Sequence, residues 1–359
     1  MESCQVIVCN AKRICSAIVL SFLFATHASA EATGDIQSLS EHLEGVMQSA
    51  VNEGFTGVAL VGRGDRIIFD FAHGLAGTVP IRTSSRFWIA SAGKQFTSAL
   101  VLKCQEEGLL SLDDTIGDFF PNAPADKQAI TLRQLLSHQS GLPQGYETEV
   151  VSSAAEAISV VMSLPLIEPP GTGFNYSNNN YQLAVAIIET VTGKPYAEVL
   201  RNAFLEPLSL HNIGQADAGD SKSVLPAISA TPERLMRSSW GGQGFYASAE
   251  DLWTWFQALQ SGVALRSQSV DELMMKGLTP ISEGEAALGW FVGDNDYGHL
   301  RVFTRGNEGF GPNSLIYFYP ESKLLIIVLT HAGPLDGQLS FSRAVHAEIE
   351  SVLEQEHYW

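Results

Sequence analysis

Trp88-Ile89-Ala90-Ser91-Ala92-Gly93-Lys94 is the most informative segment of this sequence. It places a serine and a lysine three residues apart at the expected start of a helix, where positions i and i+3 share one face. The amine of Lys94 would then lie within reach of the Ser91 hydroxyl and could activate it as a nucleophile. Unpaired N–H groups at the helix N-terminus would favour the alkoxide. The segment therefore predicts acyl transfer, and its alternative interpretation is an ordinary serine that caps a helix.

The first 30 residues have the features of an export signal. Lys12 and Arg13 precede an apolar run from Ile14 to Ala25, and Ala28-Ser29-Ala30 supplies small residues for cleavage. The apolar run is too short to span a bilayer. We expect residues 1–30 to be removed and residues 31–359 to be exported to the periplasm or outside the cell, without stable membrane insertion; the alternative is an uncleaved anchor.

The cysteine content and the net charge limit the disulfides and the binding partners that this protein is expected to have. Cys4, Cys9 and Cys15 lie in the expected signal, so Cys104 is left without a partner for an internal disulfide. Cys104 lies in an apolar helical run and is expected to act as a small hydrophobic residue. The formal net charge of −18 argues against nucleic acid or an anionic membrane as a partner.

The two ends of the sequence have β-strand patterns, whereas its middle is mostly helical. Helices are expected over Asp35 to Val51, Ser248 to Leu259 and Ser340 to Glu354, and strands over Thr56 to Val61, Arg66 to Ala72, Ala287 to Val292, Leu300 to Thr304, Ser314 to Tyr319 and Leu324 to Thr330. This order predicts an α+β fold with one central antiparallel sheet flanked by helices and an inserted, mostly helical lobe. The sheet lobe would comprise about 31–90 and 280–359, and the helical lobe about 91–279. Active sites favour the cleft between such lobes.

A second group of candidate residues lies in the loop from Gly171 to Tyr181. Tyr176 could lie beside Ser91 and Lys94, where the ammonium would favour a phenolate that takes or relays the serine proton. Asn178 could donate to the carbonyl of a substrate. The alternative is an asparagine-rich turn that caps a helix beginning near Tyr181.

A third group is the run Thr304-Arg305-Gly306-Asn307-Glu308-Gly309, which lies between two strand-like segments. An edge strand here could line the cleft, with Arg305 holding an anionic substrate group and a backbone N–H reaching the oxyanion. The alternative is a glycine-bearing connection between strands.

Other conspicuous residues are expected to be structural. His138 could complete a Ser-His-Asp triad with Ser91, but a buried histidine that bonds to backbone at a helix end is commoner. Trp240-Gly241-Gly242-Gln243-Gly244 is expected to be a turn before the helix that Ser248 caps. The sequence has no Gly-x-Ser-x-Gly, His-Glu-x-x-His or phosphate-binding glycine motif and no dense His/Cys cluster, so we expect neither a metal nor another cofactor.

Together these motifs resemble the superfamily of serine β-lactamases and penicillin-binding proteins, in the branch of class C β-lactamases, D-alanyl-D-alanine carboxypeptidases, D-aminopeptidases and related esterases. The resemblance rests on ordered segments that span most of residues 31–359: Ser91 to Lys94, Glu107 to Asp114, Leu135 to Pro143, Pro170-Gly171 with Tyr176-Ser177-Asn178, and Gly241-Gly242 before Ala249 to Leu252.

The resemblance implies an acyl-enzyme on Ser91, proton transfer shared by Lys94 and Tyr176, and substrate orientation by Asn178. Which of Lys94 and Tyr176 is the base stays open. The backbone N–H of Ser91 would form half of an oxyanion hole, and Arg305, Gly306 and Asn307 would bind substrate. The family usually has Lys or His, a variable residue and Gly in this third motif, so Arg305 would stand in for the usual cation, in a register that is open by one residue.

Two hypotheses for the function follow. The first is an exported serine hydrolase acting on a small-molecule or peptide substrate, as an ester, an amide, a D-amino-acid peptide or a β-lactam, with an esterase or peptidase favoured over an efficient β-lactamase. The second is a binding or sensor protein of the same fold that is acylated without turnover. The sequence names neither the substrate nor the oligomeric state.

Overall fold

A computed structural model of the chain describes residues 36–145, 154–215, 244–307, 312–332 and 338–359. The expected signal, Trp240 to Gln243 and Glu308-Gly309 lie outside these ranges. Within them, no helix has both the length and the apolar composition needed to cross a membrane.

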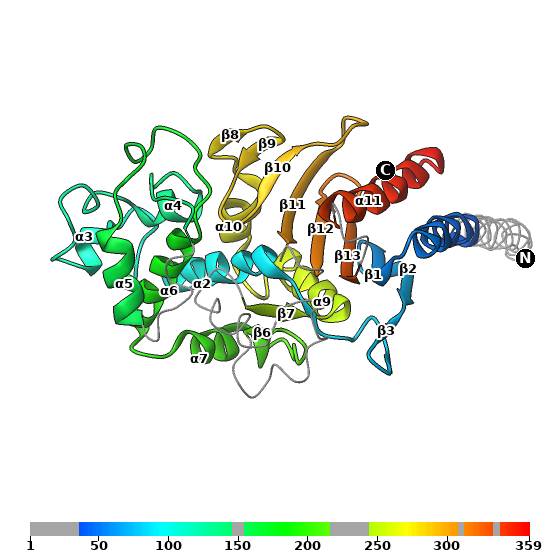
Figure 1. Cartoon of the computed structure of the whole chain (residues 1–359), viewed down its shortest axis with the longest axis horizontal. Coiled ribbons are helices and arrows are strands. Elements are labelled where there is room, and N and C mark those ends of the chain that lie inside the picture. The colour runs from blue at the N-terminus through cyan, green and yellow to red at the C-terminus, as the bar shows by residue number, and fades with distance from the viewer. Residues whose placement is uncertain (1–35, 146–153, 216–243, 308–311, 333–337) are drawn as a thin grey trace, which may run out of the picture.

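The centre of the molecule is an eight-stranded antiparallel sheet with the order β2-β1-β13-β12-β11-β10-β9-β8 (Figure 1). Strands from the two ends of the chain meet where β1 pairs with β13. The strands are β1 (Thr56–Arg63), β2 (Arg66–His73), β8 (Thr279–Ile281), β9 (Gly284–Ala286), β10 (Phe291–Asp294), β11 (Leu300–Asn307), β12 (Asn313–Tyr319) and β13 (Leu324–Ala332). This sheet confirms the predicted fold class.

Both faces of the sheet are covered. Alternate residues of a strand point to opposite faces, so in β1 Val58 joins the core on one side and Ala59 the core on the other. The helix of residues 36–52 and α11 (Gln338–Gln355) pack on the second side, here called the outer face (Figure 1). The helical part of the chain packs on the first side, called the inner face. A strand covered on both faces is buried along its whole length, as β12 is.

The helical part surrounds one buried helix, α2 (Lys94–Glu106). The other described helices of this part are the short helix η1 (Ala90–Gly93), α3 (Ile116–Phe119), α4 (Leu132–Leu136), α5 (Ala154–Ser163), α6 (Asn178–Thr192), α7 (Tyr196–Leu200), η3 (Arg201–Leu205), α9 (Ala249–Gln260), α10 (Ser267–Val270) and η5 (Asp271–Met275). Ser248 caps α9 as predicted, with its side chain accepting from the Asp251 N–H at 3.1 Å.

Local details differ from the prediction. Of the strand expected from Ala287 to Val292, only Phe291 and Val292 are extended, in β10; the residues before them connect β9 to β10, and the positive φ of Gly289, 78°, breaks the extended backbone there. A three-stranded sheet joins β5 (Phe87–Trp88) to β7 (Phe245–Ala247) and β6 (Gly214–Gln215), and the last two lie in the part of the chain expected to be mostly helical. A two-stranded ribbon, β3 (Leu75–Ala76) with β4 (Val79–Pro80), extends from the end of β2.

Candidate active site

Ser91 and Lys94 are held on one face where η1 passes into α2. The Lys94 Nζ donates to Ser91 Oγ at 3.1 Å, which is the contact that the sequence spacing predicted. Lys94 is buried, with 2% of its surface exposed, whereas Ser91 is half-buried. The arrangement therefore exposes the nucleophile and shields the amine that faces it.

Most of α2 is buried, and its polar side chains form hydrogen bonds that hold the helix in place. Gln95 donates to the Ala92 carbonyl at 2.8 Å and accepts from the Trp255 indole at 3.0 Å. Thr97 shares a hydrogen bond with the Tyr196 hydroxyl at 2.8 Å. Because each of these buried groups has a partner, the helix that carries Lys94 has one favoured position.

Tyr176 and Asn178 lie beside this pair, as predicted for the second group of residues. The Tyr176 hydroxyl donates to Ser91 Oγ at 2.8 Å, and Asn178 Oδ1 accepts from Lys94 Nζ at 2.9 Å. Four polar side chains thus converge on one point from η1, α2 and the start of α6. The hydroxyl of Ser91 has two neighbours that could take its proton.

The helix α6 begins earlier than expected, at Asn178 rather than near Tyr181. Ser177 is its N-cap residue, and its hydroxyl donates to the Pro143 carbonyl at 2.7 Å instead of capping the helix. Asn179 donates to the same carbonyl at 3.0 Å. The alternative interpretation of this loop was a turn that caps the helix, whereas its side chains attach it to the preceding segment and to Lys94.

His138 supports Tyr176 and is not part of a triad, which confirms the structural role predicted for it. Its ring stacks on the Tyr176 ring with 4.3 Å between centroids, and its Nδ1 accepts from the Ser177 N–H at 3.1 Å. Burial, and then the charge of Lys94, hold the pKa of the His138 imidazole well below its usual value. A neutral imidazole keeps Nδ1 available as an acceptor, so His138 fixes the position of the tyrosine ring.

The backbone just before Ser91 is strained. Ala90 has a φ of 48°, a left-handed conformation that a non-glycine residue rarely adopts. The preceding Ile89 is anchored on both sides, because its N–H donates to the Phe245 carbonyl at 3.0 Å and its carbonyl accepts from Ser314 Oγ at 2.7 Å. These contacts hold the strained turn that presents Ser91.

The third group lies on β11, which passes close to η1. β11 is an internal strand, so the predicted edge strand was wrong. However, β10 pairs with β11 only as far as Phe303, and the last four residues of β11, Thr304 to Asn307, extend beyond it. This end of the strand borders the site: Thr304 and Arg305 line the same hollow as Ser91 and Tyr176.

Gly306 allows the close approach between β11 and η1. A Cβ added at this position would lie 1.9 Å from the Ile89 carbonyl oxygen and 2.9 Å from the Ala90 Cβ. Both are parts of the turn that holds Ser91. Gly306 is therefore required for steric reasons, and it sets the separation between the strand and the nucleophile.

We predict that Gly306→Ala lowers the free energy of unfolding by about 3 kcal/mol or more, since the new methyl group overlaps backbone atoms that cannot move cheaply. Urea denaturation monitored by tryptophan fluorescence measures the change. Gly45→Ala is the matched control, because Gly45 lies on the exposed side of helix 36–52 with open space at its Cβ position. Equal midpoints for Gly306→Ala and the parent protein would contradict the steric role.

Arg305 does not have the free guanidinium that its prediction as a substrate-binding residue required. It forms a two-pronged ion pair with Glu283, with Nη1 3.0 Å from Oε2 and Nη2 3.1 Å from Oε1. Burial raises the pKa of Glu283, but the hydrogen bond and charge of Arg305 outweigh it and leave that pKa below its usual value. The carboxylate is therefore charged, and the pair is largely neutral as a whole.

The sequence interpretation gave no role to several residues that border the hollow, namely Ala287, Gly289, Trp290 and Phe291. It named Thr304 in the third motif without a role, although alternation along β11 places it on one face with Val302 and Gly306. The apolar residues carry no chemical pattern in sequence, and they lie in β10 and in the connection before it, a segment that was predicted as one continuous strand. Among the described residues, no three His, Cys, Asp or Glu side chains form a group suited to a metal ion.

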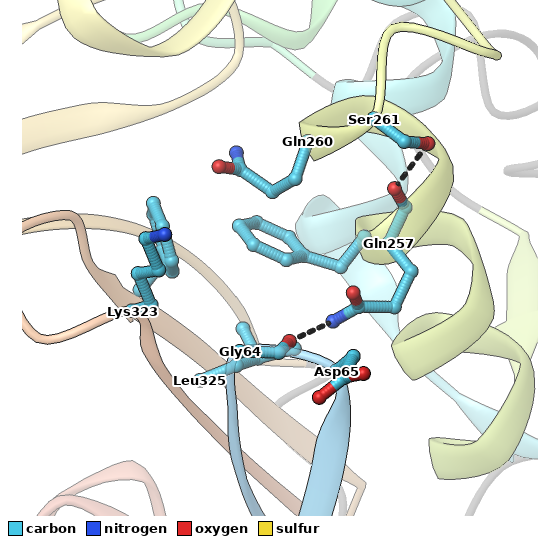
Figure 2. A pocket seen from close by; sticks show the side chains of 9 residues that line it. Gly64, Asp65, Gln257, Gln260, Ser261, Lys323 and Leu325 are labelled. Atoms are coloured by element: carbon cyan, nitrogen blue, oxygen red, sulfur yellow. Dashed lines mark hydrogen bonds between the residues drawn. The ribbon is translucent and has the colours of Figure 1, made fainter. Parts of the chain in front are cut away.

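Another hollow, of about 450 Å³, lies at the opposite end of α9 and contains none of these residues. In Figure 2, Gln257 donates to the Gly64 carbonyl at 2.9 Å, with Asp65 and Lys323 nearby. Its polar residues form hydrogen bonds across a turn and include no nucleophile paired with a base. Of these two hollows, the one beside Ser91 therefore has the arrangement suited to nucleophilic chemistry.

Comparison with solved structures supports the same fold. A D-amino acid amidase from Ochrobactrum anthropi SV3 superposes with a TM-score of 0.77 at 20% identity, over 89% of this chain and 99% of the other. The penicillin binding protein from Bacillus halodurans gives a TM-score of 0.73 at 22% identity, over 86% of this chain and 99% of the other. At these identities the likeness shows the fold alone.

Sequence relatives belong to the same group. The putative penicillin-binding protein PbpX of Bacillus subtilis (strain 168) is 24% identical over 77% of this chain and 71% of its own length. Protein flp of Staphylococcus aureus (strain N315) is 30% identical over 69% of this chain, which spans only 53% of that relative. The family model described as Beta-lactamase matches residues 39–348 and thereby includes the Ser91 segment, the Tyr176 loop and β11. A match over that length, together with the fold and the four converging side chains, shows that the chain belongs to the Beta-lactamase family.

Proposed function

We propose that this protein is an exported serine hydrolase that forms an acyl-enzyme on Ser91. One observation carries the proposal: Ser91 Oγ is 3.1 Å from Lys94 Nζ and 2.8 Å from the Tyr176 hydroxyl in a hollow that opens beside β11. A half-buried serine with two titratable neighbours at hydrogen-bond distance is the arrangement that nucleophilic catalysis needs. Membership of the family and its amidase and penicillin-binding relatives support the same class of reaction.

The proposed reaction has two half-reactions. Ser91 Oγ attacks the substrate carbonyl carbon while its proton passes to Lys94 or Tyr176, and the carbonyl oxygen becomes an oxyanion. When the tetrahedral intermediate collapses, the leaving alcohol or amine takes the proton and the acyl group stays on Ser91. Water then attacks this ester, and the acid and the free serine are released.

The other groups of the site would stabilise the oxyanion or orient the reacting groups. The Ser91 N–H at the start of η1 and a backbone N–H at the end of β11 would stabilise the oxyanion. Asn178 holds Lys94 through its side-chain oxygen, so its amide nitrogen is directed elsewhere and could orient the substrate. Lys94 and Tyr176 contact the same oxygen, and we treat them as a coupled pair that shares the proton.

Export is part of the proposal and rests on residues 1–30 of the sequence. Within the reaction class, the substrate would be an ester, an amide, a D-amino-acid peptide or a β-lactam. The alternative is a protein of this fold that is acylated on Ser91 and does not release the acyl group.

A labelling experiment tests the proposal. The protein is incubated separately with a fluorophosphonate probe and with a penicillin, and peptide mass spectrometry locates the adduct. We expect the fluorophosphonate adduct on the peptide that contains Ser91, because that half-buried hydroxyl has both Lys94 and Tyr176 at hydrogen-bond distance. A stable adduct on Ser91 without turnover of any ester would favour the alternative. An adduct on another residue, or none with either reagent, would contradict both.

A further inference from the structure

The two side chains in the middle of the β11 motif lie on opposite faces of the sheet. Val302 belongs to the core of the inner face and Phe303 to the core of the outer face. By alternation, Thr304 points toward the site and Arg305 toward α11. The pairing of β11 with β12 agrees, since Thr304 lies opposite Ile316 of the inner core and Arg305 opposite Leu315 of the outer core.

Arg305 is held on the outer face by several contacts. Its guanidinium lies 5.0 Å from the centroid of the Phe303 ring in addition to its pair with Glu283. Arg343 of α11 donates to the same carboxylate at 3.0 Å. Glu283 thereby links the turn between β8 and β9 with β11 and α11. A substrate anion would have to break this link to reach Arg305.

The inner face offers little positive charge to a substrate. Among the described residues that line the hollow, the cationic side chains are Lys94 and Arg305. Lys94 already donates to Ser91 and Asn178, and His138 is buried. Thr304 lies on the inner face of β11 and borders the hollow with an uncharged side chain. Ala287, Trp290 and Phe291 make the opposite wall apolar.

We propose that this site selects substrates that are uncharged where they contact β11, and that Thr304 is the residue that sets this preference. The inference rests on the proposed acyl-enzyme chemistry and defines its substrate class as neutral esters and amides. A carboxylate placed against Thr304 would lose its hydration without gaining a cationic partner. The formal net charge of −18 adds a general repulsion of anions.

The test compares two aryl esters with the same phenylacetylglycyl acyl group. One has 3-carbamoylphenol as the leaving alcohol and the other has 3-carboxyphenol, so they differ in charge and little in shape. A second pair carries the amide or the carboxylate on the acyl chain. We expect kcat/KM for each neutral ester to exceed that for its carboxylate partner by about tenfold to a hundredfold, the range of one missing hydrogen bond to a charged group.

Variants at position 304 identify the residue responsible. Thr304→Lys should raise kcat/KM for the carboxylate ester relative to that for the neutral ester by about tenfold or more, because it adds an ammonium on the inner face. Thr304→Met is the matched control of similar length without charge, and it should leave the preference for the neutral ester in place. Labelling with the fluorophosphonate probe shows that each variant retains a working site.

The outcomes separate this inference from the proposed function. If both esters are hydrolysed and the carboxylate ester is used as well as the neutral one or better, the substrate class is wrong while the hydrolase stands. The inference would also be overturned if Arg305→Gln lost activity toward the carboxylate ester and kept it toward the neutral ester, because Arg305 would then be the residue that binds the anion. If neither ester is hydrolysed and Ser91 stays unlabelled, the proposed function fails and this inference fails with it.

Discussion

Ser91→Ala is expected to reduce kcat for ester hydrolysis on the order of 10⁴-fold or more, the largest effect of any single substitution in this protein. The variant keeps Lys94, Tyr176 and the hollow, but it has no atom that can bond to the acyl group. The residual activity of this variant would come from binding the substrate and polarising its carbonyl group. Steady-state hydrolysis of a neutral aryl ester measures the loss, and the same variant should give no fluorophosphonate adduct.

Ser98→Ala is the matched control, because Ser98 lies in the same helix four residues after Lys94. Its hydroxyl is buried and shares a hydrogen bond of 3.3 Å with Tyr181, whose own hydroxyl also donates to the Leu136 carbonyl at 2.8 Å. Tyr181 therefore keeps a partner when Ser98 is changed. We expect activity within a few fold of the parent protein. Turnover by Ser91→Ala at a rate near that of the parent would refute covalent catalysis at this site.

Lys94→Ala is expected to slow acylation of Ser91 by about a hundredfold or more, the effect of removing a positioned proton acceptor. Lys94→Met fills more of the space and separates the loss of the amine from the cavity left by alanine. The second-order rate constant for the fluorophosphonate reaction is the quantity to measure, because it reports the first half-reaction alone.

Two further variants distinguish the roles of Lys94 and Tyr176. Lys94→Arg keeps a positive charge but cannot serve as a neutral base. If it restores most of the rate, the charge of Lys94 matters and Tyr176 is the proton acceptor; if it stays as slow as Lys94→Met, Lys94 itself takes the proton. Tyr176→Phe should be slow in the first case and nearer to the parent in the second.

Lys127→Met controls for the loss of a buried lysine elsewhere. Lys127 is 2% exposed and pairs with Asp126 at 3.0 Å, and it does not line the hollow beside Ser91. Its replacement should leave the acylation rate unchanged even if the protein becomes less stable. Acylation of Lys94→Met at the parent rate would contradict the proposed activation of Ser91.

The catalytic pair was predictable because its geometry is local. A spacing of three residues at a helix start places two side chains on one face whatever the rest of the chain does, and the structure has the 3.1 Å contact between Lys94 and Ser91. The order of strand-like and helical segments likewise predicted the sheet built from both ends of the chain. The positions of Tyr176 and Asn178 were only one of two interpretations of their loop, since 85 residues separate Tyr176 from Ser91 and no local spacing links them.

The third motif, Thr304 to Asn307, shows what could not be predicted from the sequence. The residues of β11 were identified, yet the sequence alone left the register open and favoured Arg305 as the cation in the cleft. Only the sheet decides which face each side chain occupies, and a shift of one residue reverses it. In the structure Arg305 meets Glu283, which comes from another turn and has no pattern that would link the two in sequence.

The sequence by itself determined the contact between Ser91 and Lys94 and the class of fold, because these depend on local spacing and on the periodicity of apolar residues. Tertiary structure alone decided that Thr304 lies on the inner face of β11 and Arg305 on the outer face, that His138 supports Tyr176, and that Gly306 lets β11 approach the Ile89–Ala90 turn that precedes Ser91. These features arise where segments far apart in the chain pack together, and the free energy of such contacts depends on distances that no local pattern encodes.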